Sequence, residues 1–323
     1  MSDRAANMKL FNKKMLEYKK DLLGGDTTIQ FLYCNAHFLI SLADETEKAV
    51  KFQEAGIENE SGRKLGRDAQ PAFKTWSSSE TSAFRLLRTA ADAFGPRRDE
   101  KNACREEWLA YCDRFEFKSQ FTSFRSNRFN NIFENAIALL FHFKEIPHFL
   151  NDCACHMNKK LQSICFDLQD KNIVSIITAI ALLATYLTSP YWALMNSKTP
   201  YGKFPAFVQN MKTADRWSSD SFDLSNLHNE QPFFASEFTS RSDTAYLFLN
   251  SDFCNKSLVS EVFKNICQRL MLMAATEDVL HGGDSYRVRS SIYGTYQRGR
   301  HQGRHTDYDV LSVGFTRTES PIE

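Results

Sequence analysis

The longest apolar stretch of the chain, Ile173–Leu187, limits the folds that this sequence can adopt. It spans 15 residues, is interrupted only by three Ser or Thr residues, and stops just before Ser189-Pro190. A helix that crosses a membrane needs about 20 mostly apolar residues. We therefore predict that this stretch is a buried helix in a helical core rather than a membrane span.

Apolar residues recur at helical spacing along most of the chain, which predicts a mainly α fold. An amphipathic stretch covers Met8–Leu23 and ends at Gly24-Gly25, where glycine favours a helix end. A second covers Ala36–Ala55 and leads into a polar loop, Gly56–Asp68. Further helices are expected at 77–94 (opened by the capping-box pair Ser77 and Glu80, closed by Gly95-Pro96), Asn102–Phe115, Asn127–His142, Pro147–Gln169, Lys171–Leu187, Pro205–Met211 and Lys256–Leu280, with a long loop at Ser218–Asp252.

One segment near the start of the chain has the pattern of a strand. Thr28–Cys34 is rich in β-branched and aromatic residues and follows a turn. A single strand cannot form a sheet, and it leaves its backbone hydrogen-bonding groups unpaired. The strand is therefore expected to belong to a sheet whose other strands are not visible in this sequence.

The overall charge gives no reason to expect attraction to nucleic acid or to a membrane. Forty basic residues against 39 acidic residues leave a formal net charge of +1, so any affinity for DNA has to come from a local patch. The eight cysteines are scattered and no signal peptide precedes them, which predicts an intracellular protein. Residues 285–305 contain no acid and supply the candidate DNA contacts, in what we interpret as a basic, disordered tail: Arg287, Arg289, Arg298, Arg300 and Arg304.

Three short motifs occur in a fixed order in the first half of the chain. The first is Asp3 followed four residues later by Asn7, and it leads into the first predicted helix and the strand. The second is Cys34-x-x-His37, directly after the strand. The third is Arg128-Phe129, which opens a helix of large apolar residues. Each motif is common by itself, so the order and the spacing of all three carry the information.

This order resembles that of the hAT superfamily of DNA transposases. In that family a catalytic Asp is followed four residues on by Asn, a Cys-x-x-His follows the last strand of the core, and an Arg-Trp pair opens a helix of an all-helical insertion. The resemblance covers residues 1–283. The matching positions are Asp3 and Asn7 for the first element, Cys34 and His37 for the second, and Arg128 and Phe129 for the third, with Phe in place of Trp.

The resemblance implies a mainly α fold, in which a helical insertion domain carries the remnant of a ribonuclease H-like α/β core with one or two short strands. It divides the chain into the core remnant at 1–37, the insertion domain at 38–283 and the basic tail at 284–323. In the family, three carboxylates hold two divalent cations, Mg²⁺ or Mn²⁺, for DNA strand transfer. Asp3 corresponds to the second of these carboxylates, and Thr28–Cys34 to the last strand of the sheet.

The resemblance also implies that the catalytic site is incomplete. The first catalytic Asp and its strands would precede Met1, and nothing marks Glu277 as the third carboxylate. One carboxylate cannot hold two hard cations, which need several oxygen ligands. We therefore predict no independent nuclease or strand-transfer activity and no bound cofactor, with Asp3 a metal ligand only if another chain segment completes the site.

Each motif also has a structural interpretation. Asp3 is suited to capping the helix that follows it. Cys34 and His37 are suited to packing at the strand-to-helix junction, or to half of a zinc site, for which the Cys153–His156 cluster has unusually tight spacing. Arg128 is suited to an ion pair with a carboxylate at the boundary between domains. It is equally of the type that binds a DNA phosphate.

Three hypotheses about function follow. The first is a transposase-derived, catalytically inactive protein of the nucleus that retains at most weak, nonspecific DNA binding or self-association. The second is a helical protein–protein interaction module without DNA binding. The third is a truncated product without a selected role, which would fold poorly because its strand has no neighbours. No membrane and no small-molecule cofactor is expected as a partner, since the sequence has no phosphate-binding glycine loop and no metalloprotease or hydrolase motif.

Overall fold

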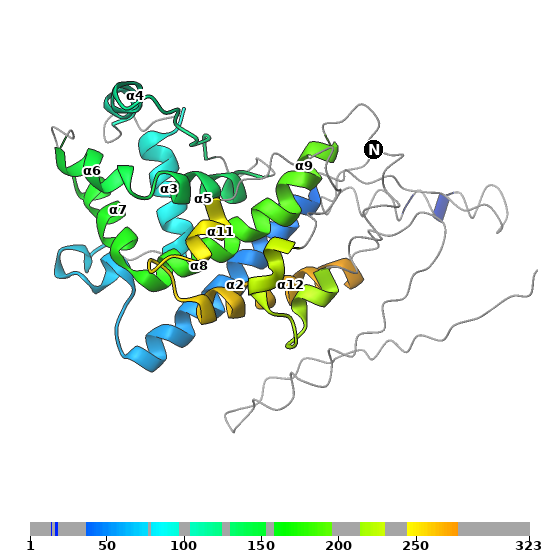
Figure 1. The fold of residues 1–323 in the computed structure, drawn as a ribbon. Coiled ribbons are helices and arrows are strands. Elements are labelled where there is room, and N and C mark those ends of the chain that lie inside the picture. Colours follow the sequence, from blue (N-terminus) through cyan, green and yellow to red (C-terminus); the bar gives the residue numbers. More distant parts are fainter. Residues whose placement is uncertain are drawn as a thin grey trace, which may run out of the picture. The chain divides into compact units, whose positions relative to one another are not determined.

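The computed structural model describes residues 14, 17, 18, 37–76, 79–96, 104–124, 130–152, 158–195, 214–229 and 244–276. Most of these residues lie in helices and none of them lies in a strand (Figure 1), so the predicted mainly α class is confirmed for this part of the chain. The predicted strand Thr28–Cys34 and helix Pro205–Met211 lie outside the described residues. Residue contacts divide the chain into a unit that ends at Met273 and a second that begins at Ala274, and the first unit is described below.

Helix α8 (Lys171–Leu183) lies at the centre of the core. Every side chain from Ile173 to Leu183 is buried, and the helix packs against α3 (Ser82–Phe94), α5 (Asn131–Phe141), α7 (Lys159–Gln169) and α11 (Thr244–Leu249) (Figure 1). The helical stretch Lys171–Ala193 is long and apolar enough to cross a membrane, but 94% of its most apolar window is buried inside the protein. The prediction of a buried core helix is confirmed.

The predicted end of this helix, before Ser189-Pro190, is wrong. A π-helical turn, η3 (Ala184–Thr188), joins α8 to a further helix, α9 (Ser189–Met195). Pro190 has no N–H group, and its ring would clash with the carbonyl four residues earlier in a regular α-helix. In the wider turn the Ser189 N–H donates to the carbonyl of Ala184, five residues back. The helix therefore continues past the proline.

Helix α2 (His37–Ser61) is longer than the predicted Ala36–Ala55. Gly56 lies inside it, where a glycine costs about 1 kcal/mol relative to alanine but does not end the helix. The end is set by Gly62, which has a positive φ of 68° and donates its N–H to the carbonyl of Glu58. The polar segment therefore begins at Gly62, six residues later than predicted. A short 3-10 turn, η1 (Gly66–Ala69), lies at the end of the predicted loop, and a second, η2 (Pro71–Phe73), follows it.

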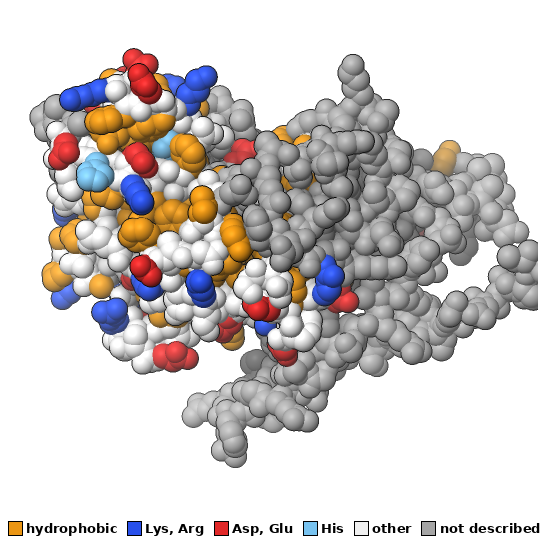
Figure 2. Space-filling model, in the orientation of Figure 1, with side chains coloured by type: hydrophobic (Ala, Val, Ile, Leu, Met, Phe, Trp, Pro, Cys, Tyr) orange, Lys and Arg blue, Asp and Glu red, His pale blue; other side chains and the backbone are white. Residues whose placement is uncertain are grey.

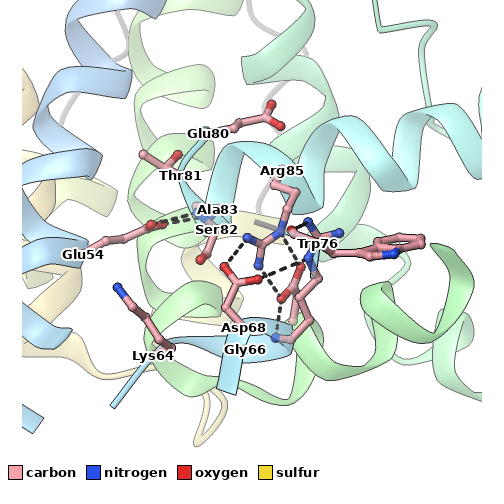
Figure 3. A network of polar contacts seen from close by, with 12 residues as sticks. Glu54, Lys64, Gly66, Asp68, Trp76, Glu80, Thr81, Ser82, Ala83 and Arg85 are labelled. Atoms are coloured by element: carbon pink, nitrogen blue, oxygen red, sulfur yellow. Dashed lines mark hydrogen bonds and ion pairs between the residues drawn. The ribbon is translucent and has the colours of Figure 1, made fainter. Parts of the chain in front are cut away.

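Helix α3 begins at Ser82, later than the capping-box pair predicted. Ser77 lies outside the described residues, and Glu80 forms an ion pair with Arg88. The N-cap is Thr81. A second cap comes from α2, because the Glu54 carboxylate accepts hydrogen bonds of 2.7 and 2.9 Å from the first two backbone N–H groups of α3 (Figure 3).

The other helices agree with the predictions in position more than in length. Helix α3 ends before Gly95-Pro96 as predicted, and α4 (Arg105–Arg114) and α5 lie inside the predicted ranges. The single helix expected at Pro147–Gln169 is two helices, α6 (Glu145–Asp152) and α7. Helix α12 (Lys256–Thr276) starts at the predicted residue. The loop expected at Ser218–Asp252 contains η5 (Leu224–Asn229) and α11, so that prediction is wrong there.

Candidate functional site

The residues predicted from the transposase resemblance fall almost entirely outside the part of the chain that the structure describes. His37 is the exception, as the first residue of α2. No described contact therefore brings the motif residues together, and their predicted roles stay predictions. The residues outside the described ranges are Asp3, Asn7, Cys34, Arg128, Phe129, Arg287, Arg289, Arg298, Arg300 and Arg304, together with Cys153–His156 and Glu277.

Within the described ranges, no three His, Cys, Asp or Glu side chains are grouped as a metal ion requires. The buried acids of this region bind a guanidinium instead. Arg85, on α3, donates to Asp167 of α7 at 2.9 Å and to Asp68 of η1 at 2.6 Å (Figure 3). The Arg85 side chain is 1% exposed, and that of Asp167 is buried as well. Three segments far apart in the sequence are joined by this ion cluster.

Backbone groups of η1 complete the ion cluster. The Arg67 N–H donates to Asp167 at 2.8 Å, and the Gly66 N–H donates to Asp170 at 2.8 Å. Asp170 is also the N-cap of α8, because its other carboxylate oxygen accepts from the Asn172 N–H. Gly66 has a φ of 49°, and a Cβ atom there would lie 2.3 Å from an Asp167 oxygen. This position therefore requires glycine.

The side chain of Arg67 extends the ion cluster into an aromatic group. Its guanidinium carbon lies 5.9 Å from the ring centre of Phe73 and 5.6 Å from that of Trp76, and it donates to the Trp76 carbonyl. Lys159, at the start of α7, lies 5.9 Å from the same Trp76 ring. Such cation–π contacts hold η2 and the turn after it against α7.

The electrostatics of the ion cluster indicate a structural role. Burial favours the neutral form of Arg85, but the carboxylates of Asp167 and Asp68 outweigh it, so the pKa of Arg85 lies above its ordinary value. Each of these charges has a partner of opposite sign, Asp167 also accepts from the Arg67 N–H, and the central guanidinium is closed off from solvent. A group that cannot reach a substrate cannot catalyse its reaction. The ion cluster therefore fastens helices together.

His142 is the second buried ionisable group that contacts several elements. Its Nε2 accepts from the Gln120 N–H at 2.9 Å, which assigns the proton of the neutral ring to Nδ1. Nδ1 has no hydrogen-bond partner among the described residues, and the ring is perpendicular to those of Trp108 and Phe141. Burial lowers the pKa of His142 to about 4. The ring is therefore neutral at ordinary pH. It supports the packing around it and does not exchange protons with a substrate.

The strongest candidate for a functional surface is an aromatic cluster formed by the half-buried Phe143 and Phe248 and the exposed Phe253, called the exposed aromatic cluster below. The Phe143 ring centre lies 5.0 Å from that of Phe248 and 5.1 Å from that of Phe253, and the latter two are 6.1 Å apart. Phe253 is 45% exposed, and Leu247, beside Phe248 on α11, is 68% exposed. Apolar side chains gather in the middle of the face shown in Figure 2, over the region of α5 and α11 in the same view.

Short hydrogen bonds hold the chain around the exposed aromatic cluster. The Ser251 hydroxyl donates to the Phe248 carbonyl at 2.7 Å, and the Cys254 thiol contacts the same carbonyl at 3.0 Å. The Asn255 N–H donates to the Ser175 hydroxyl of α8 at 2.7 Å. These hydrogen bonds anchor the turn between α11 and α12 to the central helix α8. They therefore hold the rings of the cluster in place.

Sequence reasoning found neither the ion cluster nor the exposed aromatic cluster. The partners of Arg85 are 17 and 82 residues away along the chain, and Phe143 is more than a hundred residues from Phe248. One signal was available for the first: Arg85 stands between apolar residues in a helix whose neighbouring positions read as core. Comparison of the chain with models of known protein families, with curated proteins and with solved structures found no match.

Proposed function

We propose that this chain is a transposase-derived helical protein that does not join or cut DNA by itself and that works as a protein–protein interaction domain. The order of the motifs at Asp3, Cys34 and Arg128 supports the transposase origin. The helical character of the described residues agrees with an all-helical insertion domain after a ribonuclease H-like remnant at 1–37.

The observation that carries the interaction role is the exposed aromatic cluster. Large apolar side chains that lie together on the surface of a folded domain mark sites for another macromolecule, because leaving them in water costs free energy. Scattered single residues such as Phe52, which is 65% exposed on α2, need no such explanation. Phe143, Phe248 and Phe253 differ from it because their rings are in mutual contact.

The interaction role is tested by identifying the proteins that copurify with the full-length tagged chain. Replacing Leu247 and Phe253 by serine should remove specific partners, identified by mass spectrometry, because the apolar contact area is lost. Phe52→Ser is the matched control and should keep them. An identical set of partners for all three proteins would contradict the interaction role, provided that circular dichroism shows each variant folded.

The lack of catalysis is tested separately. The purified chain, incubated with labelled duplex DNA and Mg²⁺ or Mn²⁺, should neither cleave nor join strands, because one carboxylate cannot hold two cations. A product that disappears on Asp3→Ala would show that the site is complete and that the proposal is wrong.

Weak DNA binding is a second candidate function, supported by the five arginines and the lack of acids at 285–305. Binding of this kind weakens steeply with salt, with a slope of about 0.9 in log K per log salt for each phosphate neutralised. Replacing Arg298, Arg300 and Arg304 by serine should then reduce the slope in proportion. An interaction domain without this activity shows no DNA binding at physiological salt.

A further inference from the structure

We propose that the exposed aromatic cluster binds an amphipathic segment of another protein that places apolar side chains on Phe143, Phe248 and Phe253 and acidic side chains against Lys144, Lys171 and Lys256. This inference rests on the proposed interaction role and names the chemistry of the partner. Lys144 follows Phe143 in the sequence, Lys171 is the first residue of α8, and Lys256 is the first residue of α12.

The positions of the lysines are supported by their effect on Cys254, which follows Phe253. Burial raises the pKa of the Cys254 thiol, and the positive charges of Lys171 and Lys256 both act to lower it, so both amines lie near this residue. All three lysines are exposed, and Lys256 donates to the side chain of Asn250 at 3.2 Å, within the turn between α11 and α12. Asp252 is the exposed acid within the same turn. Glu145 and Asp170, which neighbour Lys144 and Lys171 in the sequence, are half-buried, so the exposed charges around the cluster are three lysines and one acid.

The charge of the border distinguishes between the possible occupants. A second copy bound by two-fold symmetry would bring the same lysine-rich border against itself, and like charges at an interface disfavour the contact. A nucleic acid needs a continuous row of basic groups along its phosphates, whereas this surface is apolar at its centre. An amphipathic segment with acidic flanks satisfies both the rings and the lysines.

The fixed support of the cluster also suits a docking site. Because Ser251, Cys254 and Asn255 hold the turn by hydrogen bonds, little order has to be gained when a partner binds. Partners of a preformed surface lose less free energy to ordering than partners of a loose one.

The test uses two blocked, fluorescently labelled peptides of about 15 residues, with leucines at helical spacing. One carries glutamates at the remaining positions, and the other carries lysines. Fluorescence anisotropy with the full-length chain should give an affinity for the glutamate peptide at least about tenfold above that for the lysine peptide. Lys144→Glu with Lys256→Glu should reverse this preference, and Phe253→Ser should weaken the binding of the glutamate peptide.

Lys74→Glu, an exposed lysine in the turn after η2, is the matched control and should leave both affinities unchanged. Equal binding of the two peptides, or a preference that survives the double charge reversal, would overturn the inference. Displacement of the glutamate peptide by duplex DNA, or by dimerisation of the chain through Phe253, would assign the surface to another occupant and overturn it as well. If partners depend on Phe253 but the glutamate peptide does not bind, the interaction role stands and this inference fails.

Discussion

Arg85 places a positive charge in the interior between α3, α7 and η1, and it is the residue whose replacement should have the largest effect. Arg85→Met leaves the buried Asp167 carboxylate without its cation, and breaking a buried ion pair in this way costs about 3–5 kcal/mol. Urea denaturation should show that loss of unfolding free energy.

The matched control for Arg85 lies one turn later on the same helix. Arg88 pairs with Glu80, but its side chain is 39% exposed, so Arg88→Met should cost about 1 kcal/mol or less. Similar losses for the two variants would contradict the view that burial makes the Arg85 pair important. Adding Asp167→Asn to Arg85→Met should restore part of the stability, because the lone buried charge is removed.

The buried ring of His142 makes a contribution to stability that acid removes. Its pKa is about 4 when folded and 6.5 ordinarily, so the unfolded chain takes up the proton first as the pH falls. The stability that the neutral ring provides is complete above pH 6.5 and is lost between pH 6.5 and 4, by on the order of 3 kcal/mol. His142→Gln keeps an acceptor for the Gln120 N–H and should remove the His142 contribution, so the pH slope of its unfolding free energy should differ from that of the wild type in denaturation at several pH values. An unchanged acid slope would refute the assignment.

At the scale of elements, polar side chains of α5 hold a segment that has no regular structure, residues 117–124. Asn135 accepts from the Thr122 N–H at 3.1 Å and donates to the Thr122 hydroxyl at 3.1 Å. Asn131 donates to the Ser123 carbonyl at 2.9 Å. A segment without regular structure has no backbone partners from a helix or sheet. The side chains of Asn131 and Asn135 supply these partners, which explains why two asparagines are buried on α5.

Asn135→Leu should release this segment from α5. The Thr122 N–H would lose its acceptor inside the protein, which costs about 1–3 kcal/mol. Hydrogen exchange of the Thr122 amide should become faster in the variant. The Glu134 amide, bonded to the Asn130 carbonyl within α5, serves as the internal reference and should keep its rate. Equal acceleration of both amides would show that the whole helix, and not the segment, had opened.

The sequence predicted those elements whose signal is local. The run Ile173–Leu187 is apolar throughout, so its burial followed directly. For helix α2 the pattern predicts too early an end, because Gly56 is typical of a helix end, whereas the helix continues through it to Ser61. The π-helical turn was not predicted because a proline more commonly ends a helix than widens one of its turns. The short α11 could not be predicted because it depends on packing against α5 and α8, which are distant in sequence.

For the whole molecule, Glu54 opposes His142 in its effect on stability. Burial raises the Glu54 pKa to about 7, even though it caps α3. The folded protein therefore takes up this proton first, and the contribution of Glu54 to stability falls as the pH rises from 4.5 to 7, the opposite of His142. Between pH 4.5 and 6.5 the two contributions largely cancel.

A set of variants checks this balance. In the wild type, the contributions of Glu54 and His142 to the unfolding free energy should together change little between pH 4.5 and 6.5. Glu54→Gln should expose the acid sensitivity of His142, and His142→Gln should expose a slope of the opposite sign. The double variant should be nearly flat again. Parallel pH profiles for the two single variants would contradict the opposition.

The ion cluster also makes this helical unit indivisible. Its members come from residues 66–68, 85 and 167–170, so a fragment that stops before Asp167 contains a guanidinium in its interior with one of its two acids missing. A fragment that starts after Arg85 contains the Asp167 carboxylate without the guanidinium that pairs with it. We therefore expect neither half to fold stably by itself, because contacts between residues about a hundred positions apart hold the ion cluster together.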